Sequence, residues 1–528
     1  MSSARTRELP VPRPAAPVPS GSAVAEPSDG AARSQLRGSS LLLIGRGVSL
    51  LATIVIQVII VRYLTKAEYG AFAYALSIAT LLAGLTTAGL DRAVPRFVPI
   101  YDEAKDHGRL IGTIALALGT ILGLGLVLVL AVVGLQGWLV GTGIGDPQAI
   151  ALLVILIALA PLQAIDDLQT ALLAVVSTPR AIFVRRYVLT PGLRVLVVLL
   201  LAASGGDARF LATGYVLAAA IGVVIYGAIL WRILRDGGFF RRAMASGIRF
   251  PIRAVFGFAL PLLSTDLLYL VLGASDVVVL GFYRGPVAVA DLRAVQPLAV
   301  LNQVVLSSFT LLYTPLAARL FAREDRPGAG EAYWQTAVWI ATLSFPIFAV
   351  TSALAGPLTT TLFGPSYASS AVILAILATG YYANAALGFN GLTLKIHGHI
   401  RLAVMIDVAA AVINVVAILA LVPAFGAVGA AVGTATTLVV HNILKQAALQ
   451  RATGIALFDG RSVALYGGIV LAAVTLWAAV AVVRPPLVVG FAMAAVATLG
   501  VFRLGRDRLD VARVFPELRS IPIVRRLV

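Results

Sequence analysis

The chain has 528 residues, of which 59% are hydrophobic and 12% charged, whereas soluble domains carry about 25% charged residues. Apolar runs of about 20 residues, the length that crosses a bilayer, recur along almost the whole sequence and exclude a water-soluble protein. The formal net charge of +17 lies mostly in the connectors between these runs, where it indicates membrane topology and anionic lipid, with no nucleic acid partner. Because cysteine is absent, the chain has no disulfides and no thiolate metal sites.

Taken in chain order, the predicted elements are transmembrane helices between two polar tails. Residues 1–38 are rich in Pro, Ala, Ser and Arg, and we expect a disordered cytoplasmic tail there. Residues 504–528 are expected to form a basic cytoplasmic tail. The predicted fold class is an all-α polytopic membrane protein with about fourteen transmembrane helices. The spans are predicted at 41–62, 71–91, 110–134, 149–176, 182–202, 210–231, 255–281, 292–316, 335–355, 370–390, 402–422, 428–447, 462–483 and 487–502.

Lys and Arg are concentrated in alternate connectors. One predicted inner connector carries Arg180, Arg185 and Arg186, while the outer connectors hold few basic residues. The positive-inside rule then places both termini of this multi-pass protein in the cytoplasm, with the spans in the cell membrane. Every predicted outer loop is short, which argues against an outer catalytic domain.

An internal repeat appears when the sequence is laid on itself with a shift of 220 residues. Tyr63 then falls on Tyr283, Pro95 on Pro315, and Gly206 on Gly426. Each unit contains six spans, an even number, so the units are expected to form two lobes related by a pseudo-twofold axis along the membrane normal. The predicted divisions are an N-lobe at 39–235 (spans 1 to 6), a C-lobe at 250–450 (spans 7 to 12), and spans 13 and 14 at 460–503 outside this symmetry.

Four short segments resemble a known family. They are Gly-Arg-Gly at 45–47, the run from Arg62 to Phe72, Arg-Phe-Val-Pro at 96–99, and the Gly- and Ala-rich run at 423–434. Together they are similar to the polysaccharide (Wzx-type) flippases of the multidrug/oligosaccharidyl-lipid/polysaccharide exporter superfamily. The resemblance implies a transporter, without a cofactor, that translocates undecaprenyl-pyrophosphate-linked oligosaccharide for cell-surface polysaccharide biosynthesis by alternating access. It also implies membrane lipids, a glycan polymerase and glycosyltransferases as partners.

Three other functions remain open from the sequence. A lipid II flippase of the same superfamily also has fourteen spans, and its loss would be lethal. A cation-coupled multidrug antiporter would confer drug resistance, but nothing here resembles the motifs of that branch. A membrane glycan polymerase or ligase would need a substantial outer loop with acidic, His or Arg residues. The sequence has no Gly-rich nucleotide-binding loop followed by Lys and Ser/Thr, which disfavours ATP hydrolysis.

Basic residues inside the predicted spans are candidates for substrate binding. Arg194 lies about 12 Å from the nearer end of its span, where its guanidinium could bind the pyrophosphate of a polyprenyl carrier. The alternative is a structural ion pair with a membrane carboxylate. Arg46 lies nearer the inner surface and could extend toward it. Arg293 flanks the outer turn between spans seven and eight and is a candidate for the cavity mouth.

Acidic residues inside the spans are candidates for ion coupling or cavity lining. Gln163, Asp166, Asp167 and Thr170 follow the spacing i, i+3, i+4, i+7 and share one helix face. Asp266 lies near the middle of the seventh span. Intramembrane carboxylates are expensive, so we expect these three to line a sugar cavity or to exchange a coupling ion, proton or sodium. The alternative is that these side chains form hydrogen bonds that hold helices together. This is the preferred interpretation for Asn302, Gln303 and Asn414.

The remaining polar and small residues have simpler interpretations. Asp276, Asp291 and Arg293 are expected to form an exposed salt bridge around the outer turn. The four histidines, His107, His397, His399 and His441, are expected in solvated inner connectors, without the company that zinc requires. Gly429 and Gly433 have the small-xxx-small spacing of closely packed membrane helices.

Overall fold

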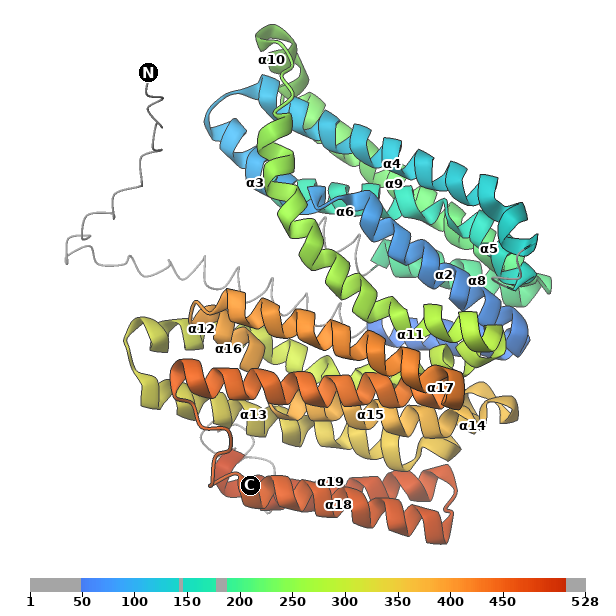
Figure 1. Cartoon of the computed structure of the whole chain (residues 1–528), viewed down its shortest axis with the longest axis vertical. Coiled ribbons are helices and arrows are strands. Elements are labelled where there is room, and N and C mark those ends of the chain that lie inside the picture. Colours follow the sequence, from blue (N-terminus) through green and yellow to red (C-terminus); the bar gives the residue numbers. More distant parts are fainter. Residues whose placement is uncertain (1–48, 142–145, 177–187, 510–528) are drawn as a thin grey trace, which may run out of the picture. The chain divides into compact units, whose positions relative to one another are not determined.

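The computed structural model describes residues 49–141, 146–176 and 188–509, with only the backbone at 176, 261, 264–269, 271–272 and 507–508. Within these ranges every regular element is helical, which confirms the all-α prediction (Figure 1). A first helix covers Ser49–Tyr63. It is followed by α2 (Lys66–Thr87), α3 (Leu90–Glu103), α4 (His107–Gly141), α5 (Pro147–Leu156), α6 (Leu159–Val176), α8 (Thr190–Ser204), α9 (Ala208–Asp236), α10 (Phe239–Ser246), α11 (Ile252–Val300), η2 (Leu301–Gln303), α12 (Val304–Ala322), α13 (Arg326–Phe348), η3 (Ala349–Ala353), α14 (Ala355–Phe363), η4 (Pro365–Tyr367), α15 (Ser370–Ala386), α16 (Asn390–Ile396), α17 (Ile400–Thr453), α18 (Val463–Val483) and α19 (Leu487–Leu509).

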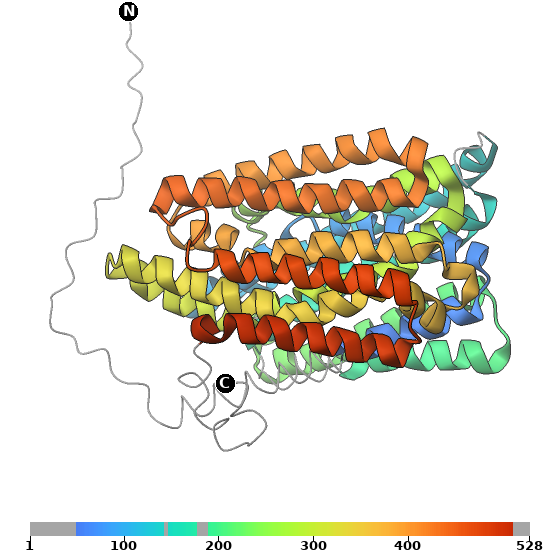
Figure 2. The ribbon, with the colours of Figure 1, turned by 90° about the horizontal axis from the view of Figure 1, so that it is seen from below.

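Two of these elements, α11 and α17, are helical hairpins. The backbone is non-helical at Gly285 in α11 and at Gly426 in α17, with φ of 75° and 57°. Gln296 donates to Asp276 at 3.2 Å, although residues this far apart in sequence would be separated by about 30 Å along a straight helix. Figure 2 shows the two arms of α17 side by side. Glycine adopts the required positive φ without strain, and both turns fall between spans that the sequence analysis separates.

The helices are long and apolar enough for a multi-pass membrane protein. Ten described segments reach the length and hydropathy of a membrane crossing, and Ser49–Tyr63 and Thr190–Ser204 are shorter apolar helices. The predicted spans 41–62 and 182–202 begin outside the described residues. The protein is therefore polytopic, and the count of fourteen spans stays a prediction.

Helix boundaries and proline positions recur at the predicted shift. Thr65 caps the start of α2, and Gly285, 220 residues further along, is the non-helical residue of α11. Pro95 lies inside α3 and Pro315 inside α12. These positions agree with the internal repeat, while the twofold axis and the lobe boundaries stay predictions.

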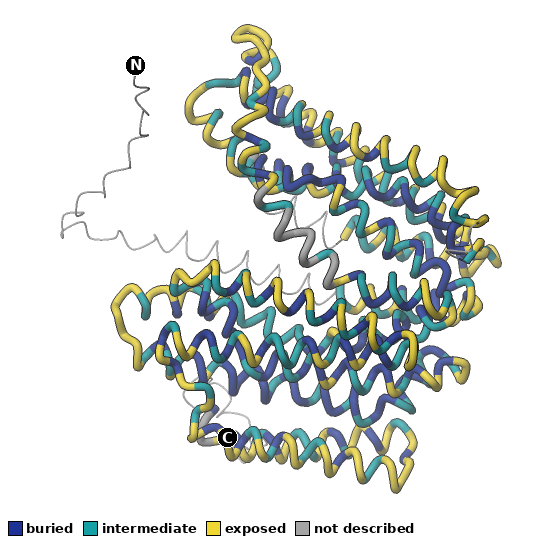
Figure 3. Tube along the Cα trace, in the orientation of Figure 1, coloured by how far each residue is buried: buried dark blue, intermediate teal, exposed yellow. Residues whose placement is uncertain are grey.

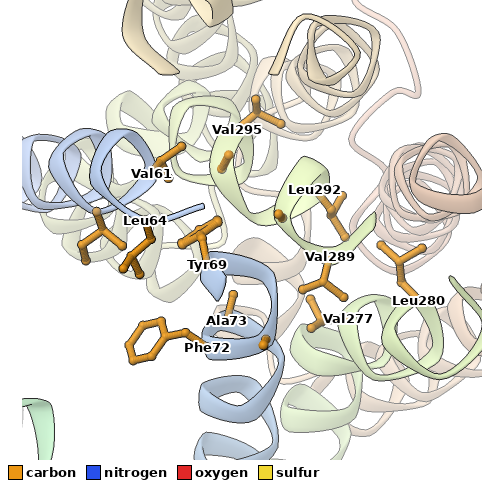
Figure 4. Close-up of a cluster of buried hydrophobic side chains, with 14 of the residues drawn as sticks. Val61, Leu64, Tyr69, Phe72, Ala73, Val277, Leu280, Val289, Leu292 and Val295 are labelled. Atoms are coloured by element: carbon orange, nitrogen blue, oxygen red, sulfur yellow. The ribbon is translucent and has the colours of Figure 1, made fainter. Parts of the chain in front are cut away.

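The contact between α2 and α11 joins the two halves of the sequence. Thr65 caps α2 and exchanges hydrogen bonds with Glu68, a capping box that fixes where the helix starts. A side chain at Gly70 would collide with the carbonyl group of Pro286, so only glycine permits this approach. Figure 4 shows the apolar cluster there: Ala73 lies on the side of Val277 and Val289 of α11, while the ring of Phe72 points to the opposite side.

Burial separates interior helices from helices suited to face lipid. In the most apolar window of α13, 67% of the residues are buried, against 17% in α4, and Figure 3 shows exposed residues along α4. Gly429 packs on the carbonyl of Leu421, and Gly433 lies against Ile418. The prediction of close helix packing at these glycines is therefore confirmed.

Candidate functional site

A cavity of about 450 Å³ lies between α2, α6, α8 and α9, helices that lie next to one another in Figure 1. We call it the α6–α8 cavity. Three of the six predicted site residues line it, namely Asp166, Asp167 and Arg194. Its other lining residues are Leu76, Thr80, Leu159, Leu162, Gln163, Thr190, Leu193, Tyr215, Ala218, Ala219 and Gly222.

Helical spacing explains why these polar groups converge. Gln163, Asp166 and Asp167 occupy one face of α6, and this face borders the cavity as the sequence pattern predicts. Thr170 instead turns its hydroxyl to the backbone, donating to the carbonyl of Asp166 at 2.8 Å. Arg194 enters from α8. Sequence periodicity thus gives the shared face of α6, whereas only the fold brings Arg194 to it.

Arg194 is arranged to receive a ligand rather than to hold helices together. Its guanidinium lies 5.6 Å from the ring centre of Tyr215, a cation–π contact, and its N–H groups have no hydrogen-bond partner among the described residues. The side chain is exposed, and within the described residues it forms no ion pair. Tyr215 is itself held edge-on by Phe72, with ring centres 5.4 Å apart. A planar guanidinium with unused donors suits a phosphate or a carboxylate.

Arg293 lies in a different place, within a polar cluster between α2 and α11. Its guanidinium donates to Gln296 at 2.7 Å and to Ser77 at 3.0 Å, and its carbonyl accepts from Gln57 at 3.1 Å. Gln296 in turn donates to Asp276. We call these five residues the Arg293 cluster. Because both terminal nitrogens are engaged, Arg293 holds elements from the two halves of the sequence together in this structure.

The expected exposed salt bridge around the outer turn is wrong. Asp276 is only 4% exposed because helices cover this part of α11. Asp291 pairs instead with Lys66, the first residue of α2, at 2.7 Å. Asp276 and Asp291, on the two arms of the hairpin at Gly285, therefore have different partners.

A second polar cluster ties the start of α2 to the C-terminal half of the chain. Asp291 also accepts from Ser369 and Ser370, at 2.9 and 2.6 Å. Arg62 donates to the carbonyls of Leu362, at 2.7 Å, and Thr361, which are unused carbonyls in the last turn of α14. We call Arg62, Lys66, Asp291, Ser369 and Ser370 the Lys66 cluster.

The other predicted residues divide into two groups. Arg46 lies outside the described residues, and so does the side chain of Asp266 on α11. Asn302 donates to Thr351 at 3.1 Å, and Asn414 joins Ser275 to Thr437 at 3.0 and 3.3 Å. Both asparagines form hydrogen bonds between helical segments, as predicted from the sequence.

A buried charged cluster that the sequence patterns did not predict lies between the arms of α17. Asp407, 4% exposed, has one carboxylate oxygen 2.8 Å from His441 and 2.8 Å from Lys445. Its other oxygen lies 3.9 Å from Lys395 of α16. We call these four residues the Asp407 cluster. The expectation that His441 lies in a solvated connector is wrong, because it is inside α17. The available signal was a set of charged residues inside two predicted spans.

A larger cavity, of about 850 Å³, lies beside the N-terminal turns of α13 and the segment 453–462. It contains none of the predicted site residues, and its charged lining is balanced: Arg326 and Arg461 against Glu331 and Asp459. Size alone therefore does not select a site, and the α6–α8 cavity remains the candidate on chemical grounds.

The sequence and the fold each match known proteins. The model of the polysaccharide biosynthesis protein family matches residues 35–321, more than half of the chain. Among curated proteins no match was found.

Three solved structures are similar to the fold. The inward-facing conformation of a multidrug resistance MATE family transporter of the MOP superfamily gives a TM-score of 0.64 at 13% identity, covering 77% of this chain and 95% of that one. The lipid II flippase MurJ in an inward closed conformation gives 0.63 at 12% identity, covering 88% and 99%. The MATE multidrug transporter DinF-BH gives 0.54 at 13%, covering 82% and 99%.

At these identities the structures show a shared fold, while the sequence match shows the family. The prediction of a transporter rather than an enzyme is confirmed at the level of family and fold. The chain belongs to the polysaccharide biosynthesis protein family and has the fold of the MOP-superfamily transporters.

Proposed function

We propose that the protein translocates a polyprenyl-diphosphate-linked oligosaccharide across the cytoplasmic membrane for cell-surface polysaccharide biosynthesis. The observation that carries the proposal is the α6–α8 cavity, where Arg194, whose donors are unused within the described part of the chain, lies beside acidic, amide and hydroxyl groups. Membership of the chain in the polysaccharide biosynthesis protein family supports the same class of substrate.

The chemistry of the lining fits such a substrate in two parts. Arg194 would hold the diphosphate, because a guanidinium matches phosphate oxygens in a two-pronged geometry. Gln163, Asp166 and Asp167 would accept from or donate to sugar hydroxyls, and Tyr215 offers an aromatic face. A cavity of about 450 Å³ holds the charged head and the first sugar units, while the prenyl tail stays in lipid.

The proposed cycle is alternating access with both termini in the cytoplasm. The start of α2 carries the Lys66 cluster, while Arg92 and Arg96 follow its end. The positive-inside rule then puts the Lys66 cluster on the outer side. Contacts that join the two halves on the outer side are what an inward-facing state requires, and the MATE structure with the TM-score of 0.64 is in an inward-facing conformation. Rupture of these contacts would accompany release to the outside.

A lipid II flippase is the second candidate. The match to MurJ covers 88% of this chain, against 77% for the MATE transporter. Lipid II is also a polyprenyl diphosphate carrying sugars, so the same cavity would serve it. The two substrates differ in the peptide, which distinguishes them experimentally.

Transport by purified protein in liposomes tests the proposal. A fluorescent polyprenyl-diphosphate oligosaccharide is placed in both leaflets, and its accessibility to an external sugar-modifying enzyme is followed over time. We expect protein-dependent exposure that Arg194→Ala slows about 10- to 100-fold, the effect of losing a charge-assisted hydrogen bond of about 1.5–3 kcal/mol. Arg194→Lys should recover only part of the rate.

The control is Arg209→Ala, which removes an exposed arginine of α9 that does not line the cavity. Equal loss in both variants would contradict the assignment of Arg194. Exposure of lipid II but not of the oligosaccharide would select the second candidate. Extrusion of a cationic dye without exposure of either lipid would reject both in favour of a drug antiporter.

A further inference from the structure

The Asp407 cluster holds an imidazole that is placed to gain and lose a proton. The Nε2 atom of His441 lies 2.8 Å from a carboxylate oxygen of Asp407. An ionised carboxylate only accepts hydrogen bonds, so Nε2 carries a hydrogen whether the ring is neutral or charged. The proton that distinguishes the two forms therefore binds at Nδ1. Among the described residues Nδ1 has no hydrogen-bond partner, and the 17% exposure of the side chain leaves it open to water.

The charged groups around His441 act on the proton that its imidazole can bind, and their effect depends on distance. Asp407 stands 2.8 Å from the ammonium of Lys445 and 3.9 Å from that of Lys395. The carboxylate favours a protonated His441, and the two ammonium groups oppose it. In a medium of low dielectric constant both effects are strong and fall with distance. A small movement of α16 or of either arm of α17 would therefore change the balance of charge around His441.

The described groups around the Asp407 cluster come from four elements. Lys445 shares its helical arm, and Lys395 comes from α16. The remaining described contacts around the cluster are neutral. Asn442, next to His441, donates to Asn384 of α15 at 2.9 Å, and Ser275 of α11 donates to Asn414, two turns beyond Asp407 on the same arm. Asp266 is a further carboxylate on α11, and its side chain lies outside the description.

We propose that His441, positioned by Asp407, is the binding site of the coupling proton of this transporter. The inference rests on the proposed transport function and deepens it by naming the ion and its site. A proton from water binds Nδ1 to form an imidazolium, and it leaves to water when the partners of Asp407 move. No other bond changes.

The location of the cluster gives the direction of coupling. Asp407 is in the second turn of α17, and Lys395, 39% exposed, is one residue from the end of α16. The connector between α16 and α17 lies on the cytoplasmic side in the proposed orientation. The inward-facing state would release the proton to the cytoplasm and accept the glycan lipid. Export would then exchange an inward-moving proton for an outward-moving substrate.

Transport under an imposed pH gradient tests the coupling, with the full chain in liposomes and the fluorescent oligosaccharide lipid as probe. His441→Gln keeps an N–H donor for Asp407 but cannot titrate. His107→Gln is the matched control, since His107 packs against Phe239 with ring centres 5.7 Å apart and lies outside the cluster.

For one proton per cycle, each unit of pH gradient should shift the steady-state ratio of substrate between leaflets by about tenfold. We expect this shift in the unaltered chain and in His107→Gln. His441→Gln should lose this shift. A full response in His441→Gln, or flipping by the unaltered chain that ignores the gradient, would overturn the proposal.

A second measurement decides the proton site even if no glycan lipid is flipped. The chain has four histidines, so ¹³C-labelled histidine in the full-length protein in nanodiscs gives few signals, which single His→Gln variants assign. The His441 signal should respond to the pH of the medium, and Asp407→Asn should change that response. An unresponsive His441 would refute the site itself, whereas absent flipping with a normal titration would refute only the transport function.

Discussion

The α6–α8 cavity and the Asp407 cluster both place charged residues inside apolar helices, but they treat these charges differently. In the cavity, Arg194 and Asp167 are exposed, and Arg194 has only a cation–π contact among the described residues. In the Asp407 cluster, one carboxylate is 4% exposed and is shared by three basic side chains. The first arrangement leaves hydrogen-bond donors for a ligand, whereas the second satisfies the charge within the protein.

The position of a charged residue within a predicted span is therefore a poor guide to its role. Asp166 and Asp407 both lie within long apolar runs. Their roles follow from the neighbouring helices, because an intramembrane charge is tolerated either beside a water-filled cavity or within a paired network. Substitutions should therefore separate effects on transport from effects on stability.

The largest expected effect on stability is at Asp407. Asp407→Ala leaves Lys445 and His441 buried without their carboxylate, and breaking a buried charge pair costs about 3–5 kcal/mol. Thermal unfolding of the purified protein in detergent should show a large fall in Tm. Arg194→Ala, at an exposed position in the cavity, should change stability by no more than about 1 kcal/mol. A similar Tm for both variants would remove the distinction between the two regions.

The close approach of α2 to α11 should be the next most sensitive feature. Gly70→Ala forces a methyl group onto the backbone of Pro286, and overpacking of this kind costs about 1–3 kcal/mol. We expect a lower Tm and slower transport. Gly119→Ala, where the added methyl group meets open space, is the control and should leave Tm unchanged or slightly higher. An unchanged Tm in Gly70→Ala would show that these helices are not held this closely.

The Lys66 cluster should have a smaller effect, on the balance of conformations. Asp291→Asn removes a salt bridge whose partners are 21% and 15% exposed, and pairs of this kind contribute about 0.2–1 kcal/mol. The population of the outer-closed state should fall by up to about fivefold. The distance between residues 63 and 366, across the Lys66 cluster, reports this population. Because the chain has no cysteine, spin labels at Tyr63→Cys and Ser366→Cys measure this distance without background. Glu103→Gln, on α3, should leave the distance distribution unaltered.

The smallest effect should come from His397, in the connector between α16 and α17. Burial, followed by the neighbouring His399 and Arg326, lowers the pKa of His397. The folded state therefore resists its protonation, so its penalty is absent above the unfolded pKa and grows as pH falls. The decrease in Tm between about pH 7 and about pH 5 should be slightly greater in the unaltered chain than in His397→Gln. Identical pH profiles would show that His397 contributes nothing.

Much of the fold could be predicted from local patterns. Apolar runs predicted most of the helical segments, and a shift of 220 residues brought Pro95 inside α3 onto Pro315 inside α12. The spacing of Gln163, Asp166 and Asp167 predicted their common face. The prediction that Asn302 and Asn414 form hydrogen bonds between helical segments is confirmed. These successes share a cause, because helical periodicity and bilayer length act over a few turns of one segment.

Contacts between distant segments were beyond such patterns. Nothing near Asp276 in sequence shows that it is buried under other helices, and nothing near His441 shows that Asp407 lies beside it. The pairing of Lys66 with Asp291 likewise depends on how α2 meets α11.

The sequence by itself determined that this protein is a helical membrane protein, which residues share a helix face, and which family it resembles. The tertiary structure alone decided that Arg194 meets Asp166 and Asp167 at a cavity, that Arg293 lies elsewhere, and that Asp407 gathers three bases. The physical reason is that a helix face is fixed by backbone geometry within one segment. Its partner is fixed by turns such as Gly426 and by close approaches such as Gly70, which join residues far apart in the chain.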